Sequence, residues 1–322
     1  MIYPKIPIIF LAAAMSAPTL AIADDDELEF DEAYLYFELN DTDGDLGIHG
    51  KVDGGPWKKV KIEGPNDRTL LKIRARSKLA RQGMTELFFE SAEPTFDELH
   101  PVDFFNRFPE GEYEWEGLTL EYEEIEGEVY LSHVMPAAPV VTGVGDLLEG
   151  DNPGFAIEIE DGEEEVAKQC WEVEADDNGD VVISWRAVTM SHKDMWDVDP
   201  QPLLLGEILR YDEDEEPERK FPLGDPGSFT EDDLEYYEFV AEIDDTEYKS
   251  TAVIPPGTTS WTVPAEVITL ANEEGEGEVK FEIIVRAKSP EVMEDDGDLV
   301  KSKPGNQSAV EDCFEIYEED DE

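Results

Sequence analysis

The chain has 322 residues, of which 82 are Asp or Glu and 24 are Lys or Arg, so its formal net charge is −58. Such a surface repels phosphate groups, which argues against nucleic acid and anionic membranes as partners. Hydrophobic residues make up 40% of the chain and aromatic residues 10%. This is enough to bury the cores of two domains, so the composition also argues against global disorder.

Residues 1–23 have the pattern of a secretory signal peptide. Lys5 precedes an apolar run, and small residues stand at the expected cleavage positions before Asp24. The run is short and broken by Pro7 and Pro18, so no transmembrane segment is expected. Residues 24–32 form an acidic leader. We therefore expect an exported protein, either periplasmic or extracellular.

Short strands follow from residue 33 and define an expected β-rich domain over residues 33–137. They are rich in β-branched or aromatic residues and bounded by Gly, Pro, Asn and Asp. They cover residues 34–39, 57–62, 70–76, 87–90, 112–116, 118–122 and 128–133. One short helix interrupts them, because Pro101 suits a first helical turn and Phe104, Phe105 and Phe108 form one apolar face.

Asp41, Asp43 and Asp45 alternate around Gly44, an arrangement in which carboxylates can converge on Ca²⁺. The stretch departs from the EF-hand loop, because Leu46 stands where that loop needs Gly. The alternative is a polar turn between two strands. Apart from Ca²⁺, the sequence suggests no cofactor.

Nine of the 24 Lys and Arg residues lie between residues 58 and 81. They are Lys58, Lys59, Lys61, Arg68, Lys72, Arg74, Arg76, Lys78 and Arg81. This basic island could hold a polyanion such as an acidic glycan. The alternative is that its cations pair with surrounding carboxylates, and the abundance of acids favours that second interpretation.

Three motifs of the first domain, at residues 40–49, 85–90 and 108–111, resemble an uncharacterised β-rich module of exported bacterial proteins. The resemblance implies an architecture and no activity.

Pro136 to Pro139 is interpreted as a linker. The second domain then covers residues 138–317, with acidic loops at 158–166, 211–218 and 291–298, and an acidic tail follows at 318–322. No long helical pattern is visible in this half.

Segments of the second half recur in the order of a fibronectin type III domain, over roughly residues 165–317. They correspond to strand B (Val181–Trp185), strand C (Tyr236–Ile243), strand E (Thr259–Pro264), strand F (Val279–Ala287) and strand G (Gly305–Ser308 with Cys313–Ile316). The family has a Tyr early in strand F, where this chain has Val279. The resemblance implies an all-β protein with two β-sandwich-like domains, the second one fibronectin type III or immunoglobulin-like.

Alternation along these strands predicts which side chains face the core of the sandwich. Val181, Ile183 and Trp185 are expected opposite an aromatic and aliphatic set from the other sheet. That set comprises Tyr237, Phe239, Phe281 and Ile283. Trp185 and Trp261 are expected to be core or half-buried strand residues.

The B–C and F–G loops lie at the same pole of such a sandwich, and both are enlarged here. They run over about 190–234 and 289–304. We expect a cation- or ligand-binding face there. Its candidate residues are Asp194, Trp196, Asp197, Asp199, Glu294, Asp295, Asp296 and Asp298. The alternative is an acidic insertion without a binding role.

Cys170 and Cys313 are the two cysteines of the chain. An even pair in an exported protein is typical of a disulfide. In the implied sandwich, Cys313 lies on strand G and Cys170 where strand A would run. Because strands A and G are both at edges, we expect a Cys170–Cys313 bridge.

No catalytic motif of the serine hydrolase, zinc protease or P-loop type is present, so the chain is not expected to be an enzyme. The expected function is noncatalytic binding or spacing at the bacterial envelope or outside the cell, with an unidentified protein or glycan as ligand. The alternative is a carbohydrate-active or accessory protein that acts on extracellular polysaccharide.

Overall fold

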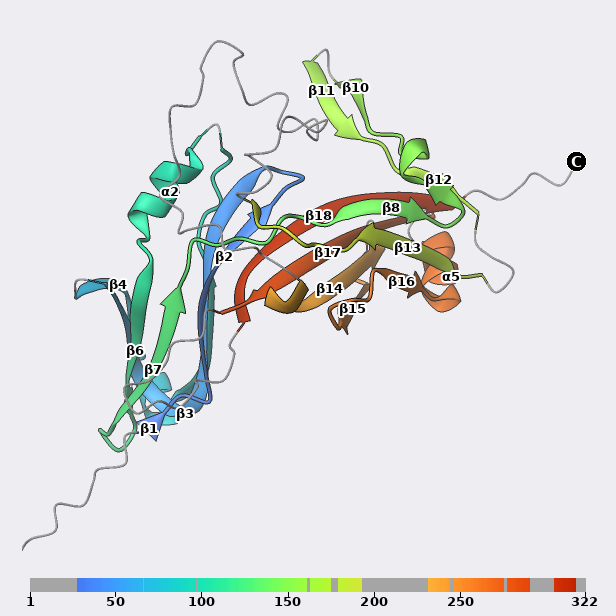
Figure 1. Ribbon diagram of the computed structural model, residues 1–322. Coiled ribbons are helices and arrows are strands. Elements are labelled where there is room, and N and C mark those ends of the chain that lie inside the picture. Colours follow the sequence, from blue (N-terminus) through green and yellow to red (C-terminus); the bar gives the residue numbers. More distant parts are fainter. Residues whose placement is uncertain are drawn as a thin grey trace, which may run out of the picture.

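The computed structural model describes residues 28–65, 67–96, 98–160, 163–174, 179–192, 231–243, 246–274, 277–289 and 304–316. These residues form a mostly β structure, which confirms the expected all-β class (Figure 1). No helix among them is long and apolar enough to cross a membrane.

The N-terminal half is a sheet built around one long bent strand. Its strands are β1 (Leu28–Glu29), β2 (Glu32–Asn40), β3 (Asp45–Gly64), β4 (Arg68–Arg74), β5 (Met84–Glu90), β6 (Gly111–Thr119) and β7 (Glu124–Leu131). The first part of β3 pairs with β2 and β5, and the part after Trp57 pairs with β4 and β6. Pairing is interrupted between Asp53 and Trp57, where Gly54 and Gly55 allow the bend. The sheet therefore curls around its own core.

That core contains Trp57, Val60, Ile62 and Trp115, all fully buried. The predicted helix is confirmed as α2 (Pro101–Arg107), whose Phe104 and Phe105 pack edge-on against Phe37 of β2. A short helix that the sequence analysis missed, α1 (Leu79–Gln82), links β4 and β5.

The C-terminal half is a sandwich of two sheets. One contains β8 (Val140–Val144), β9 (Leu147–Leu148), β13 (Val181–Arg186) and β16 (Ser260–Val263). The other contains β14 (Leu234–Ile243), β15 (Lys249–Ile254), β17 (Glu278–Lys288) and β18 (Pro304–Ile316). Strands A, B and E thus lie in one layer and C, F and G in the other, which is the arrangement of a fibronectin type III or immunoglobulin-like sandwich.

The residues expected in the sandwich core are buried. Val181, Ile183 and Trp185, and the four predicted residues of the facing sheet, are each at most 2% exposed. Trp261, expected in the core or half-buried on a strand, lies on β16 with its side chain 37% exposed. Since β16 is the last strand of its sheet, part of this ring lies beyond the cover of the opposite layer.

Two elements of this half differ from the sequence prediction. Helix α5 (Ala265–Glu274) connects β16 to β17, and its Ile268 and Ala271 are buried in the core. Part of the expected acidic loop at 158–166 belongs to a two-stranded hairpin, β10 (Phe155–Glu160) with β11 (Glu163–Lys168). This hairpin stands away from the sandwich (Figure 1).

One sheet runs through both halves. Its order is β1-β7-β6-β3-β2-β18-β17-β14-β15, with β12 (Trp171–Val173) also paired to β18. The two halves meet where β2 and β18 run parallel, with Gln307 opposite Glu38 and Ala309 opposite Asn40. Hydrophobic clusters lie on either side, one built from residues 30–135 and the other from residues 137–314. The junction is therefore a hydrogen-bonded strand pair.

Candidate functional site

Asn306 of β18 fixes the junction from one face of the sheet. The Phe37 N–H donates to its Oδ1 at 2.8 Å, and its Nδ2 donates to the carbonyls of Ser132 (2.6 Å) and Val134 (2.9 Å). The Ser308 hydroxyl donates to the carbonyl of Pro136 at 2.6 Å. The stretch from Pro136 to Pro139, interpreted from sequence as a linker, is buried here.

The other face of the junction carries a cluster of ionisable side chains, which we call the junction cluster: Glu38, His49, Glu93, Glu282 and Arg286. The sequence analysis missed it, because its members come from three strands (β2, β3 and β17) and one loop, far apart in the chain. Only the paired register of β3, β2, β18 and β17 brings them together.

Burial controls the protonation of the junction cluster. Burial, together with the nearby charges of Glu282 and Glu93, raises the pKa of Glu38 to about 7. Burial together with Glu311 also raises the pKa of Glu282 to about 7. Burial lowers the pKa of His49 to about 4. At neutral pH, the 2.9 Å contact between His49 and Glu93 is therefore a hydrogen bond from a neutral imidazole.

Arg286 is the cation of the junction cluster. Its guanidinium lies 4.3 Å from the centre of the Tyr36 ring and 5.7 Å from the centre of the Tyr236 ring. Both distances are within the limit of about 6 Å for a cation–π interaction. The side chain is 8% exposed, and its Nε has no hydrogen-bond partner within the described part of the chain. The cluster can bind and release protons near neutral pH, since two of its carboxyls titrate there.

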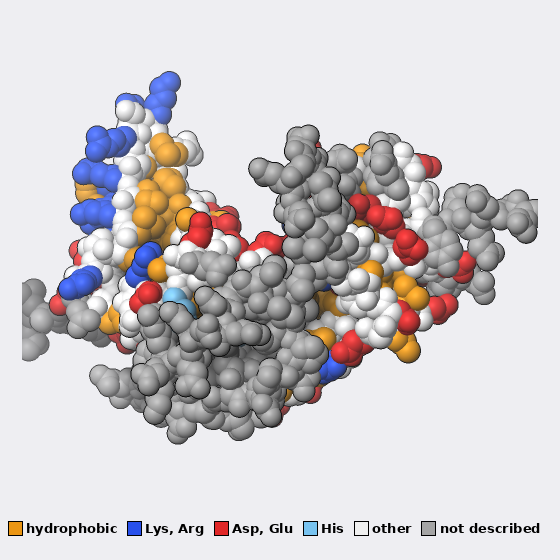
Figure 2. Space-filling view, turned by 90° about the horizontal axis from the view of Figure 1, so that it is seen from above, with side chains coloured by type: hydrophobic (Ala, Val, Ile, Leu, Met, Phe, Trp, Pro, Cys, Tyr) orange, Lys and Arg blue, Asp and Glu red, His pale blue; other side chains and the backbone are white. Residues whose placement is uncertain are grey.

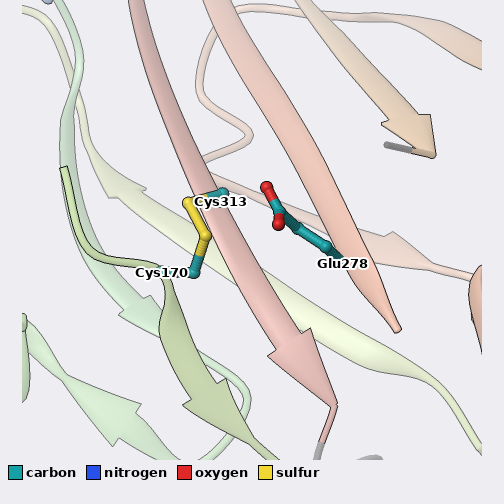
Figure 3. A group of neighbouring side chains, drawn as sticks. All are labelled: Cys170, Glu278 and Cys313. Atoms are coloured by element: carbon teal, nitrogen blue, oxygen red, sulfur yellow. A yellow bond between two sulfur atoms is a disulfide. The ribbon is translucent and has the colours of Figure 1, made fainter. Parts of the chain in front are cut away.

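The predicted disulfide is present. Cys170 and Cys313 are bonded and lie 143 positions apart in sequence. The carboxylate of Glu278 points towards them (Figure 3). Because both sulfurs are in a disulfide, neither is a thiolate, and this trio is not a set of metal ligands.

A cavity of about 640 Å³ adjoins the disulfide on the outer face of β14, β17 and β18. Thr42, Lys168, Lys249, Glu282 and Asp312 are among the residues that line it. Asp312 is buried but satisfied, since Trp171 Nε1 donates to it at 3.0 Å and Lys168 Nζ lies 3.3 Å away. These contacts hold the carboxylate in place and leave the cavity wall polar.

The Asp41, Asp43 and Asp45 segment forms the tight turn between β2 and β3. Asn40 organises it, because its Oδ1 accepts from the Thr42 N–H (3.0 Å) and the Asp43 N–H (3.3 Å). Thr42 exchanges two hydrogen bonds with the backbone of Glu311 on β18. The turn thus docks on the C-terminal half.

The ligand atoms of these three aspartates do not converge. Among the described residues, several groups of three Asp, Glu, His or Cys side chains bring their ligand atoms within 4.8 Å of one another, and none of these groups contains Asp41, Asp43 or Asp45. Calcium binding at this turn stays a prediction.

The expected binding face lies outside the described residues. Asp194, Trp196, Asp197 and Asp199 fall within 193–230, and Glu294, Asp295, Asp296 and Asp298 fall within 290–303. The described strands mark the ends of both connections. The first ends at Leu234, where β14 begins, and the second lies between Lys288 of β17 and Pro304 of β18.

The basic island lies on β3, β4, α1 and the turn between them. Lys and Arg side chains line one edge of the N-terminal half (Figure 2). Lys61 forms salt bridges with Glu63 (2.8 Å) and Glu116 (2.7 Å), and Lys58 lies over the Tyr122 ring. Lys72 and Arg74 are exposed and have no carboxylate partner among the described residues. The expected pairing with surrounding acids is thus only partial.

No protein-family model matches the chain, and no curated protein matches it. Among solved structures, it is similar to the FN1–FN3 domains of chicken CNTN1, with 7% identity, a TM-score of 0.23, and coverage of 90% of this chain and 68% of that one. It is also similar to the BSP domain of a biofilm-associated protein (12% identity, TM-score 0.20, 88% and 30% covered). A third similar structure is a 1.5-MDa bacterial ice-binding adhesin (10%, 0.21, 90% and 65%). At these TM-scores the likeness carries no argument, so the fold assignment rests on the strand pairing.

Proposed function

We propose that this chain is an exported, noncatalytic binding or spacer protein of the bacterial envelope or extracellular space. The observation that carries the proposal is the continuous sheet, in which the paired strands β2 and β18 join the two halves. A shared sheet restricts the motion of one half against the other, which suits a part that holds a ligand-binding surface at a fixed distance and orientation.

Two further features support the proposal. The Cys170–Cys313 disulfide suits an oxidising compartment outside the cytosol. The first long connection of the sandwich ends at β14 and the second begins at its neighbour β17. Long loops on a rigid scaffold are where binding residues concentrate.

Cell fractionation of the producing organism tests the export, with the N-terminus of the recovered protein expected at Asp24. A glycan and protein array, run beside a broad hydrolase screen, tests the function. We expect binding without turnover. Turnover that a single carboxylate substitution abolishes would overturn the noncatalytic assignment in favour of an enzyme.

Two variants locate the ligand once one is found. The segment 290–303 can be replaced by a short turn, because Lys288 and Pro304 are paired across the ends of β17 and β18. We expect this variant and Trp196→Ala to lose binding. Trp261→Ala, which removes a 37% exposed ring from β16, is the matched control and should bind normally. Unchanged binding by both loop variants would discard the proposed face.

A further inference from the structure

Charges are sorted by sign on the outer face of the four strands β4, β3, β6 and β7. Lys59 and Lys61 of β3 with Lys72 and Arg74 of β4 make up what we call the cationic stripe. The acidic stripe comprises Glu114 and Glu116 of β6 with Glu124, Glu126 and Glu128 of β7.

The strand register shows that both stripes lie on the same face. Paired residues of neighbouring strands point to the same side of a sheet. Lys61 is opposite Lys72 on one side and opposite Glu116 on the other, and Glu116 is in turn opposite Glu126. The residues that alternate with them, such as Val60 and Trp115, are fully buried on the inner side.

Each stripe contains like charges directly opposite each other, an arrangement that destabilises a sheet. Lys59 is opposite Arg74 and Lys61 is opposite Lys72, while on the acidic side Glu116 is opposite Glu126. Lys61 has local partners, but Lys59, Lys72 and Arg74 have no carboxylate partner among the described residues. An oppositely charged surface would relieve both stripes.

We propose that this face docks on the same face of a second copy of the chain. A two-fold axis parallel to the strands, between β3 and β6, places the cationic stripe of each copy on the acidic stripe of the other. Lys72 of one copy then faces Glu126 of its partner, and Arg74 faces Glu124, because these residues lie in the same rows across the sheet. Lys72 and Arg74 of β4 and Glu124 and Glu126 of β7 are then each matched by an opposite charge.

A free polyanion fits this face less well than a second copy does. It would be attracted to β4, but the acidic stripe begins two strands away, a distance of roughly 10 Å. That stripe repels an acidic polymer, whereas a second copy presents opposite charge to Lys61 and Lys72, which meet Glu116 and Glu126, and to Arg74, which meets Glu124. The charge pattern therefore favours self-association.

The net charge of −58 gives the association a distinctive dependence on salt. At an ionic strength of about 0.01 M the Debye length is about 30 Å, so the whole molecules repel each other. At about 0.15 M it is about 8 Å, which screens the long-range repulsion and leaves the close pairs of the stripes. At about 1 M it is about 3 Å, and the close pairs are screened too. We expect the strongest association at intermediate salt.

Charge-reversal variants test the proposal by sedimentation equilibrium in EDTA, which keeps divalent cations off the acidic stripe. Lys72→Glu/Arg74→Glu and Glu124→Lys/Glu126→Lys should each raise the dissociation constant of the dimer by roughly tenfold or more, as expected for close charge pairs. An equimolar mixture of the two should restore a dimer, because β4 of the first variant and β7 of the second, which face each other, then carry opposite charges, as do the other two facing strands. This rescue shows that both variants are folded.

Arg186→Glu/Lys249→Glu is the matched control, since it reverses two exposed cations on the sandwich. It should dimerise like the wild type. A wild-type monomer at every salt concentration would overturn the proposal, as would reversal variants that dimerise normally or a mixture that stays monomeric. Retention of a monomer on immobilised dextran sulfate, lost in Lys72→Glu/Arg74→Glu, would assign the face to a polyanion and overturn it as well.

Discussion

The backbone N–H of Phe37 donates a 2.8 Å hydrogen bond to the side-chain oxygen of Asn306, which lies 269 positions later in the chain. Asn306 also donates to two carbonyls of the segment that connects the halves. One buried amide thus ties β2, β18 and the connecting segment together, and it does so where the two halves share a sheet.

Asn306→Ala should destabilise the protein by about 3 kcal/mol or more, because it leaves a buried N–H and two carbonyls without partners. Urea unfolding measures the change. Asn152→Ala, which removes an exposed 2.8 Å bond to the Gly154 N–H, is the control and should cost less than about 1 kcal/mol. Equal effects of the two substitutions would show that the junction amide has no special role.

Removal of the disulfide in Cys170→Ala/Cys313→Ala should lower the free energy of unfolding by about 4–5 kcal/mol, since the bridge closes a loop with a sequence separation of 143. Reduced wild-type protein should match the variant in the same urea experiment. Free thiols in the unreduced, denatured wild type would contradict the pairing.

Stability should rise as the pH falls from about 8 to about 6.5. Glu38 and Glu282 have pKa values of about 7 in the folded protein and a reference value of 4.5, so the folded state binds more protons in this range. Below about pH 6.5 the trend should weaken because of His49, whose pKa is about 4 in the folded protein. In this range the unfolded chain protonates His49 and the folded protein does not, which opposes the gain from the two carboxyls.

Glu38→Gln tests the source of this pH dependence. It should reduce the slope of stability against pH by roughly half, since one of two such carboxyls is removed. Glu172→Gln on β12, where the residue is exposed, is the control and should leave the slope unchanged. A slope that is identical in all three proteins would remove the junction cluster as its cause.

The strands of the second half were predictable because burial alternates along them. Val181, Ile183 and Trp185 face the core on one side of β13, and period-two alternation is visible without any partner. Helix α2 was predictable for a similar reason, since Pro101 and three phenylalanines mark its start and its buried face.

The rest depends on distant contacts. Helix α5 follows Pro264, and the N–H of Ala265 donates to Asp180, 85 positions earlier, so no local capping residue marks it. The parallel pairing of β2 with β18 joins the two ends of the chain, which no local pattern can predict. The sorting of charge on β3, β4, β6 and β7 likewise requires the register.

The Asp180 contact itself leads to a prediction. Asp180→Ala should destabilise the protein by about 1 kcal/mol, the typical cost of losing a side-chain acceptor at a helix start, and Asp180→Asn should restore most of it. Urea unfolding at constant salt measures both. An Asn variant as unstable as the Ala variant would show that the charge of Asp180, and not its hydrogen bond, matters.

The most direct test of the continuous sheet is amide hydrogen exchange, followed by mass spectrometry of peptides that cover β2 and β18. If β2 and β18 form one cooperative unit, amides of 36–40 and 306–310 should exchange only by global unfolding and with the same free energy. In Asn306→Ala both segments should lose protection together. Fast exchange in β18 beside a protected β2, or two separate unfolding transitions, would contradict a single body.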